Sequence, residues 1–171
     1  MRVDRWFAFV DLSGFTSFGD EFGDDESVRV LTAFRGACRT VATDFGVRIA
    51  KWLGDGCMFV SVIPEQLVGG MCTLERAVDD IDLPLQIHAG MAGGSVILLE
   101  GDDYTGGCVN LASRLMDAAG PHEIFTLPEI AAHAPHGTPV EPVGMLTVAG
   151  FHEPVEVVRL GCGLAPVRRF A

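Results

Sequence analysis

The chain has 171 residues, of which 49% are hydrophobic and 20% are charged, enough to bury one hydrophobic core. We predict a single domain over residues 1–171, with its core at about 5–160. The net charge of −11 leaves no basic surface for a phosphate backbone, which excludes nucleic acid as a partner. No apolar run approaches the length of a membrane span, so no membrane association is expected.

The cysteines and the lysine narrow the chemistry further. The five cysteines are odd in number, widely spread and never in a C-x-x-C pair, which predicts neither a disulfide framework nor a zinc site. A reducing, cytoplasmic location is the simplest interpretation. Lys51 is the only lysine, so any lysine chemistry has one possible position.

Apolar periodicity and turn residues predict an alternation of strands and helices. The order strand, helix, hairpin, helix, strand predicts an α+β fold, with a ferredoxin-like βαββαβ antiparallel-rich sheet and further C-terminal elements. We expect strands at 5–10, 47–53, 57–62, 84–89, 93–100, 123–126, 145–148 and 155–160; helices at 24–45, 65–80, 108–119 and after residue 128; and loops at 101–106 and 134–142.

Two carboxylates occupy positions where a mixed sheet can bring them together. Asp11 follows the first predicted strand, and Asp55 lies at the tip of the predicted hairpin. Such a pair suits a hard divalent cation, and two cations if substrate phosphates supply further oxygens. Either aspartate alone could also be a residue that caps a turn.

Three ordered motifs carry a resemblance to a known family. FVDLSGFT (9–16), KWLGDGCMFV (51–60) and GDDYTGGCVNLASRL (101–115) resemble the motifs of the class III adenylyl and guanylyl cyclases. The resemblance covers nearly the whole chain, from 7 to about 160. It implies that Asp11 and Asp55 bind two Mg²⁺ or Mn²⁺ ions, with the carbonyl of Leu12 as an additional ligand.

The same resemblance implies a site for the triphosphate. The turn after the first strand would lead into a short helix whose backbone amides point at the β and γ phosphates. Some members of the family place a phosphate-contacting arginine where Arg48 stands, and a role on the strand surface is the alternative. The residues of this turn are Ser13, Gly14, Phe15 and Thr16.

Base recognition and catalysis are assigned by resemblance to four further residues. Lys51 would donate to adenine N1, and Asp103 would accept from the 6-amino group, a pattern that guanine reverses. Tyr104 either abuts the adenine or is an exposed loop aromatic. Asn110 and Arg114, one helical turn apart, would orient the ribose and stabilise the pentacovalent α-phosphate.

These assignments predict an adenylyl cyclase that converts ATP to 3′,5′-cyclic AMP and pyrophosphate by two-metal-ion in-line attack of the ribose 3′-hydroxyl. The family implies a homodimer with composite active sites. Two alternatives stay open, namely a weak or silent nucleotide-binding and dimerisation module, and a guanylyl cyclase. Ala149 stands where most members carry a triphosphate-binding lysine, so we expect weak ATP affinity and a preference for Mn²⁺.

The five histidines are scattered without a metal-ligand spacing, and we expect them to be solvated or locally hydrogen-bonded.

Overall fold

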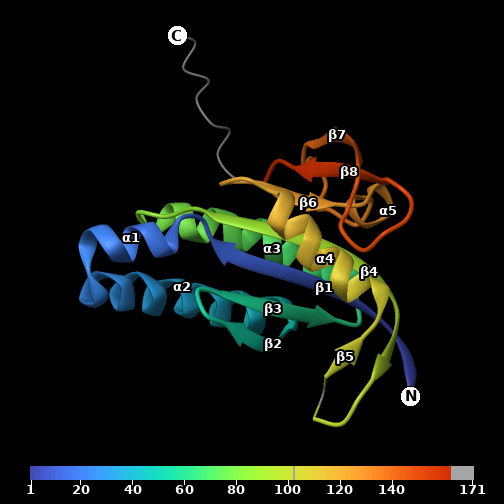
Figure 1. Ribbon diagram of the computed structural model, residues 1–171, viewed down its shortest axis with the longest axis horizontal. Coiled ribbons are helices and arrows are strands. Elements are labelled where there is room, and N and C mark those ends of the chain that lie inside the picture. Colours follow the sequence, from blue (N-terminus) through green and yellow to red (C-terminus); the bar gives the residue numbers. More distant parts are fainter. Residues whose placement is uncertain (102, 163–171) are drawn as a thin grey trace.

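A computed structural model describes residues 1–101 and 103–162 (Figure 1). Its strands form one eight-stranded sheet in the order β2-β3-β1-β4-β6-β8-β7, with β5 paired to β4. The strands are β1 (Arg2–Leu12), β2 (Arg48–Leu53), β3 (Gly56–Ser61), β4 (Ile87–Leu98), β5 (Tyr104–Thr105), β6 (Ile124–Thr126), β7 (Val140–Leu146) and β8 (Val155–Leu160). The helices are α1 (Phe15–Phe22), α2 (Asp24–Phe45), α3 (Pro64–Asp80), α4 (Gly107–Ala118) and α5 (Pro128–Ala131).

The predicted ferredoxin-like arrangement is confirmed. Apart from the short α1, which lies between β1 and α2, the elements β1, α2, β2, β3, α3 and β4 follow one another along the chain. β1 pairs antiparallel with both β3 and β4. The sheet is extended by β6, which pairs parallel with β4, and by the antiparallel pair of β7 and β8. The single domain predicted over 1–171 stays a prediction, and its end at 163–171 lies outside the described residues.

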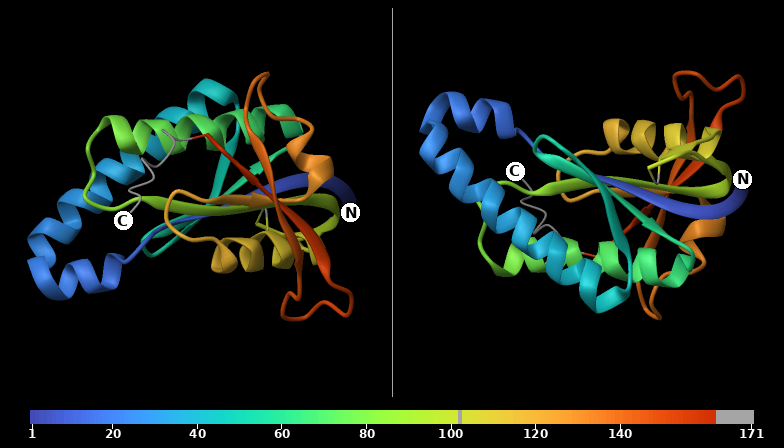
Figure 2. Two further views of the ribbon diagram at one scale, coloured as in Figure 1. Left: turned by 90° about the horizontal axis from the view of Figure 1, so that it is seen from above. Right: turned by 90° about the horizontal axis from the view of Figure 1, so that it is seen from below.

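Helices cover both faces of the sheet. Figure 2 shows α2 and α3 on one face and α4 on the other. Along β1 the side chains alternate between two cores, so that Ala8 and Val10 belong to the cluster under α2 and α3, and Phe7 to the cluster under α4. Because β1 is buried on both faces, its strand end is a rigid support for Asp11.

Local sequence features explain where α2 begins and ends. Its first turn holds three acidic residues, 24–26, which complement the positive end of the helix dipole. It ends at Gly46, whose φ of 65° is the left-handed conformation that glycine adopts readily. The pair Gly69 and Gly70 stays inside α3 because Phe45 packs there, 3.0 Å from where a Cβ of Gly69 would lie.

The prediction of two strands at 84–89 and 93–100 is wrong, because one strand, β4, runs from Ile87 to Leu98. The glycines in the middle of this segment suggest a break in the sequence, but they serve close packing. A Cβ on Gly90 would lie 2.1 Å from the backbone nitrogen of Met116 in α4, and one on Gly93 would lie 2.2 Å from the Trp6 ring. Gly90 lets α4 approach the sheet, and Gly93 makes room for the Trp6 ring of β1.

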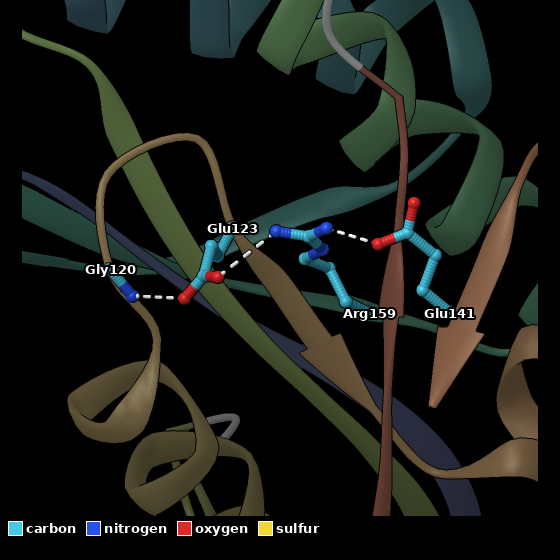
Figure 3. A network of polar contacts seen from close by, with 4 residues as sticks. All are labelled: Gly120, Glu123, Glu141 and Arg159. Carbon is cyan, nitrogen blue, oxygen red and sulfur yellow. Dashed lines mark hydrogen bonds and ion pairs between the residues drawn. The ribbon is translucent and has the colours of Figure 1, made fainter. Parts of the chain in front are cut away.

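The C-terminal elements also differ from their predicted bounds. The loop predicted at 101–106 contains the short strand β5, and β7 covers 140–146 instead of 145–148, so it includes the end of the loop predicted at 134–142. β7 is aligned by its pairing with β8, where Glu141 lies opposite Arg159. Arg159 contacts both Glu141 and Glu123, and Glu123 accepts a hydrogen bond from the amide of Gly120, as Figure 3 shows.

The prediction of no disulfide is wrong, because Cys72 and Cys162 form one in the structure. Their separation of 90 residues explains why spacing gave no signal. The Arg76 guanidinium also donates to the carbonyl of Cys162 at 2.7 Å, so the segment after β8 is fixed to α3. Among the described helices, none combines the length and the apolar character that crossing a bilayer requires.

Candidate active site

Asp11 and Asp55 meet at one edge of the sheet. Asp11 is the second-to-last residue of β1, and it lies opposite Gly56 on β3. Gly56 directly follows Asp55, which lies at the hairpin tip. A Cβ on Gly56 would lie only 2.7 Å from Asp11 Oδ1, so the absence of a side chain there lets the two strands bring the carboxylates together. The side chain of Leu12 is buried, which fixes the backbone beside Asp11.

The electrostatics of this pair fit a divalent cation. Partial burial, followed by the negative charge of Asp11, raises the pKa of Asp55 above its usual value. Among the described residues, Asp11 Oδ1 is buried and has no hydrogen-bond partner. A dication between the carboxylates would offset their repulsion and give this oxygen a ligand, so the residues present fit the metal ions that the fold implies.

His88 is a neighbour of Asp11 that sequence analysis missed. It lies opposite Asp11 in the pairing of β1 with β4, with its Nε2 3.7 Å from Asp11 Oδ2. Its Nδ1 lies 2.9 Å from the carbonyl of Met116. The contact with Asp11 raises the pKa of His88, and partial burial opposes this effect. His88 has the local hydrogen bonding expected from the sequence, but only the register of β1 with β4 shows that His88 lies beside Asp11.

Arg35 is a second residue that the sequence did not reveal. From α2 its guanidinium donates to the carbonyl of Gly54 at 3.0 Å, and it stacks over the Trp52 ring at 5.0 Å. Gly54 directly precedes Asp55, so α2 supports the tip of the hairpin that carries the second carboxylate.

The predicted phosphate-binding turn leads into a short helix, as expected. Gly14 adopts a left-handed conformation with φ of 77° and precedes α1, which begins at Phe15 and includes Thr16. The amide of Ser13 donates to the carbonyl of Gln86 at 2.8 Å. Within the part of the chain that the structure describes, no side chain caps the start of α1, so its first amides are available to an anion.

The two predicted base-reading residues lie in contact. Lys51 Nζ on β2 lies 2.6 Å from Asp103 Oδ1, just before β5, although the two are 52 residues apart in sequence. The amide of Tyr104 also donates to Asp103. Lys51 and this amide both lower the pKa of Asp103, which keeps it an acceptor. Both side chains are nearly half exposed and are accessible to a ligand.

Arg48 and Tyr104 form a neighbouring contact. Arg48 donates to the Tyr104 hydroxyl at 2.7 Å, and the Tyr104 ring packs edge-on against Phe7 at 5.3 Å. Both residues line a cavity of about 270 Å³ together with Arg5. The structure therefore places Arg48 close to Lys51 and Asp103, and Tyr104 packs partly on the core.

Asn110 and Arg114 project from α4 into a second cavity, of about 400 Å³. Ala149 lines the same cavity, so the position of the missing lysine faces the two predicted catalytic residues. Arg114 is half exposed and lies 3.2 Å from Asp117, an exposed ion pair that a ligand can replace at small cost. The chain thus presents three groups: the carboxylates with His88, the pair of Lys51 and Asp103, and this cavity.

Comparisons with known proteins give the following matches. No protein-family model matches the chain. An uncharacterized protein of Mycobacterium tuberculosis (strain H37Rv) is 38% identical over 158 residues, which make up 89% of this chain and 40% of that protein. A pH-sensitive adenylate cyclase of M. tuberculosis (strain CDC 1551) is 32% identical over 119 residues, 69% of this chain and 29% of that protein. The chain thus spans less than half the length of these relatives.

Two solved structures are similar over nearly the whole chain. The adenylyl cyclase CyaB from P. aeruginosa matches with a TM-score of 0.78 at 23% identity, covering 94% of each chain. The guanylyl cyclase Cya2 matches with a TM-score of 0.81 at 23% identity, covering 98% of this chain and 96% of that one. Because one of these proteins is named an adenylyl cyclase and the other a guanylyl cyclase, the fold alone does not distinguish ATP from GTP as the substrate.

Proposed function

Since the chain has the fold of the class III adenylyl and guanylyl cyclases, we propose that it is an adenylyl cyclase domain that converts ATP to 3′,5′-cyclic AMP and pyrophosphate. The observation that carries the choice of ATP is the 2.6 Å contact between Lys51 and Asp103, which places one donor and one acceptor side by side. The resemblance of the three motifs supports the same reaction.

The carboxylates of Asp11 and Asp55 would hold two Mg²⁺ or Mn²⁺ ions. Bound there, the ions supply charge neutralisation for the triphosphate and lower the pKa of the ribose 3′-hydroxyl. The uncapped amides at the start of α1, after Gly14, would bind the terminal phosphates. Asp11 is held by the buried strand β1, and Asp55 by the hairpin tip that Arg35 supports, so both ligands are preorganised.

Adenine recognition follows from the donor and acceptor pattern of its edge. Adenine presents an acceptor at N1 and a donor at its 6-amino group, whereas guanine presents a donor at N1 and an acceptor at O6. Lys51 donates and ionised Asp103 accepts, which suits adenine. With guanine both groups would face a like partner, and the site would lose two hydrogen bonds while desolvating two charges.

Catalysis would use the cavity that Asn110 and Arg114 line on α4. Asn110 would orient the ribose, and Arg114 would stabilise the negative charge that develops on the α-phosphate, for which its fixed planar fork of donors is suited. We propose that these groups act together with Asp11 and Asp55 of a second copy, as in the family that the motifs resemble. The working enzyme is then a homodimer with two composite sites.

A second candidate function rests on Ala149. A lysine at this position would extend into the cavity of Asn110 and Arg114, and its absence removes one positive charge from the proposed triphosphate site. A nucleotide-binding module without turnover is the function that this observation favours. Intact Asp11, Asp55, Asn110 and Arg114 favour the active enzyme.

Nucleotide turnover by the purified protein separates these functions. ATP or GTP is supplied with Mg²⁺ or Mn²⁺, and the products of the wild-type chain are compared with those of Asp11→Ala. We expect cyclic AMP from ATP, faster with Mn²⁺, and none from the variant. Nucleotide binding without any cyclic product from folded wild-type protein would support the silent module, and cyclic GMP as the main product would support a guanylyl cyclase.

A further inference from the structure

A second group of metal-ligating side chains lies away from the proposed active site. Glu75 and Asp79 stand one turn apart on α3 and therefore share one face of that helix. His122 lies in the turn between α4 and β6, where its backbone has a φ of 63° and its amide donates to the carbonyl of Ile87 at 2.9 Å. The imidazole points toward α3, where its Nδ1 contacts Glu75.

The ligand atoms lie close enough together to be candidates for binding one ion. His122 Nδ1 lies 2.9 Å from Glu75 Oε1 and 3.7 Å from Asp79 Oδ1, and one ligand atom from each residue falls within 4.8 Å of the others. Two ligands at about 2.1 Å from a common ion are separated by roughly 3.0 Å at a right angle and roughly 3.4 Å at the tetrahedral angle. The two distances from His122 Nδ1, 2.9 and 3.7 Å, lie on either side of these values.

Glu75 supplies an independent reason to expect a cation. Its side chain is only 1% exposed, and among the described residues its Oε2 is buried without a hydrogen-bond partner. A buried carboxylate oxygen without a donor costs free energy that its single contact with His122 does not fully offset. A dication shared by Glu75, Asp79 and His122 would satisfy this charge.

We propose that Glu75, Asp79 and His122 form a binding site for a transition-metal dication of the Zn²⁺ type, separate from the carboxylates at Asp11 and Asp55. An imidazole nitrogen among the ligands favours Zn²⁺ and its first-row neighbours over Mg²⁺ and Ca²⁺, which prefer oxygen ligands. Asp79 and His122 are 19% and 35% exposed, so the ion can enter from solvent and keep a water ligand on that side.

Such an ion would connect α3 to the turn between α4 and β6. The carbonyls of Met116 and Ala119 contact His88 Nδ1 at 2.9 and 3.1 Å, so the end of α4, directly before this turn, supports the neighbour of Asp11. The ion is therefore expected to stabilise the folded chain, because it binds the native arrangement of α3 and this turn more tightly than the unfolded chain.

Zn²⁺ binding by the full chain tests the proposal. Asp11→Asn and Asp55→Asn are combined as a background, so that the proposed active-site ligands cannot account for the bound ion. Equilibrium dialysis should find one Zn²⁺ per chain, and Zn²⁺ should raise the melting temperature. Co²⁺ should give visible absorption bands from a mixed nitrogen and oxygen ligand set. His122→Ala should remove the bands, and Asp79→Asn should weaken Zn²⁺ binding by about 10- to 100-fold.

His152→Ala is the matched control, because His152 is an exposed histidine outside the group. The affinity of this variant for Zn²⁺ should equal that of the background chain. Circular dichroism establishes that each variant is folded, and Asp79→Asn decides the result if His122→Ala does not fold. The proposal is overturned if the background chain binds no Zn²⁺, if His122→Ala and Asp79→Asn leave its affinity unchanged, or if Mg²⁺ binds the group as tightly. The first two results would make the group an ion pair of Glu75 and His122 only. The third would make it a general dication site without the preference for Zn²⁺ proposed here.

Discussion

At the scale of single residues, the repulsion between Asp11 and Asp55 has a measurable consequence. Burial and the charge of Asp11 raise the pKa of Asp55 in the folded chain above its unfolded value. Folding therefore favours the protonated form, and this stabilisation is present below the unfolded pKa and is lost as pH rises through the folded pKa. Near pH 7 without metal, ionised Asp55 destabilises the fold.

Asp55→Asn should therefore raise the melting temperature of the metal-free chain at pH 7, and the difference from wild type should shrink as the pH is lowered toward 4. Mn²⁺ should raise the melting temperature of the wild type more than that of the variant, because the variant lacks one carboxylate ligand. Thermal unfolding at several pH values, with and without Mn²⁺, measures both effects. The account of this pair fails if the variant is less stable at pH 7 and responds to Mn²⁺ like the wild type.

Lys51 carries the proposed preference for adenine. Lys51→Glu replaces the donor at adenine N1 with an acceptor, so kcat/KM for ATP should fall by about 10²-fold or more. Arg29→Glu is a matched control, since it reverses an exposed charge on α2 that pairs with Glu26 of the same helix, away from Lys51. Steady-state kinetics with ATP and GTP provide the test. If the ratio of kcat/KM for ATP to kcat/KM for GTP were the same in Lys51→Glu as in the wild type, this role would be contradicted.

Ala149 is the residue whose replacement should increase affinity. Ala149→Lys places a cation in the cavity of Asn110 and Arg114, and a charge-assisted contact to a phosphate contributes about 1.5 to 3 kcal/mol. The KM for ATP should fall by roughly one to two decades. Ala149→Met, of similar length but uncharged, is the control. An equal KM in the lysine variant and the wild type would show that position 149 does not contact the triphosphate.

At the scale of elements, the β2–β3 hairpin depends on Gly56. In Gly56→Ala the new Cβ would lie 2.4 Å from the carbonyl oxygen of Val10, so the strands must separate, at a cost of about 1 to 3 kcal/mol in the free energy of unfolding. In Gly36→Ala, in the exposed interior of α2, the new Cβ meets no side chain or other element within 4 Å among the described residues. This change should stabilise the chain by about 0.5 to 1 kcal/mol. Chemical denaturation measures the free energy of unfolding of both variants, which should fall in Gly56→Ala and rise in Gly36→Ala. Equal changes in the two variants would contradict the packing described at the hairpin.

The elements show which parts of the fold the sequence predicts and which parts depend on packing. Helix α2 ends at Gly46 as predicted, because the local conformation of glycine sets that end. The sequence predicts two strands where the structure has the single strand β4. Gly90 is needed because α4 packs closely against it, and no local sequence pattern shows this contact. The bond between Cys72 and Cys162 and the position of His88 beside Asp11 likewise depend on residues that are distant in the sequence.

At the scale of the whole molecule, the chain presents its proposed functional groups in separate places. Asp11 lies near the end of β1 and Asp55 at the tip of the β2–β3 hairpin. Asn110 and Arg114 lie on α4, which covers the face of the sheet opposite α2 and α3 (Figure 2). The motifs predict the residues of these groups but not their distances, which depend on the sheet. A second copy that supplies the complementary group would complete each site, and this is the central claim of the proposed function.

Mixing two inactive variants tests this claim most directly. Asp11→Ala removes a proposed metal ligand and Arg114→Ala removes the proposed transition-state donor, so each variant alone should form no cyclic AMP. In an equal mixture, half of the dimers combine the two chains and hold one intact site of two, so activity should return to about a quarter of the wild-type value. If the mixture stays inactive although both chains are folded and exchange partners, or if either variant alone keeps wild-type activity, the composite site is contradicted.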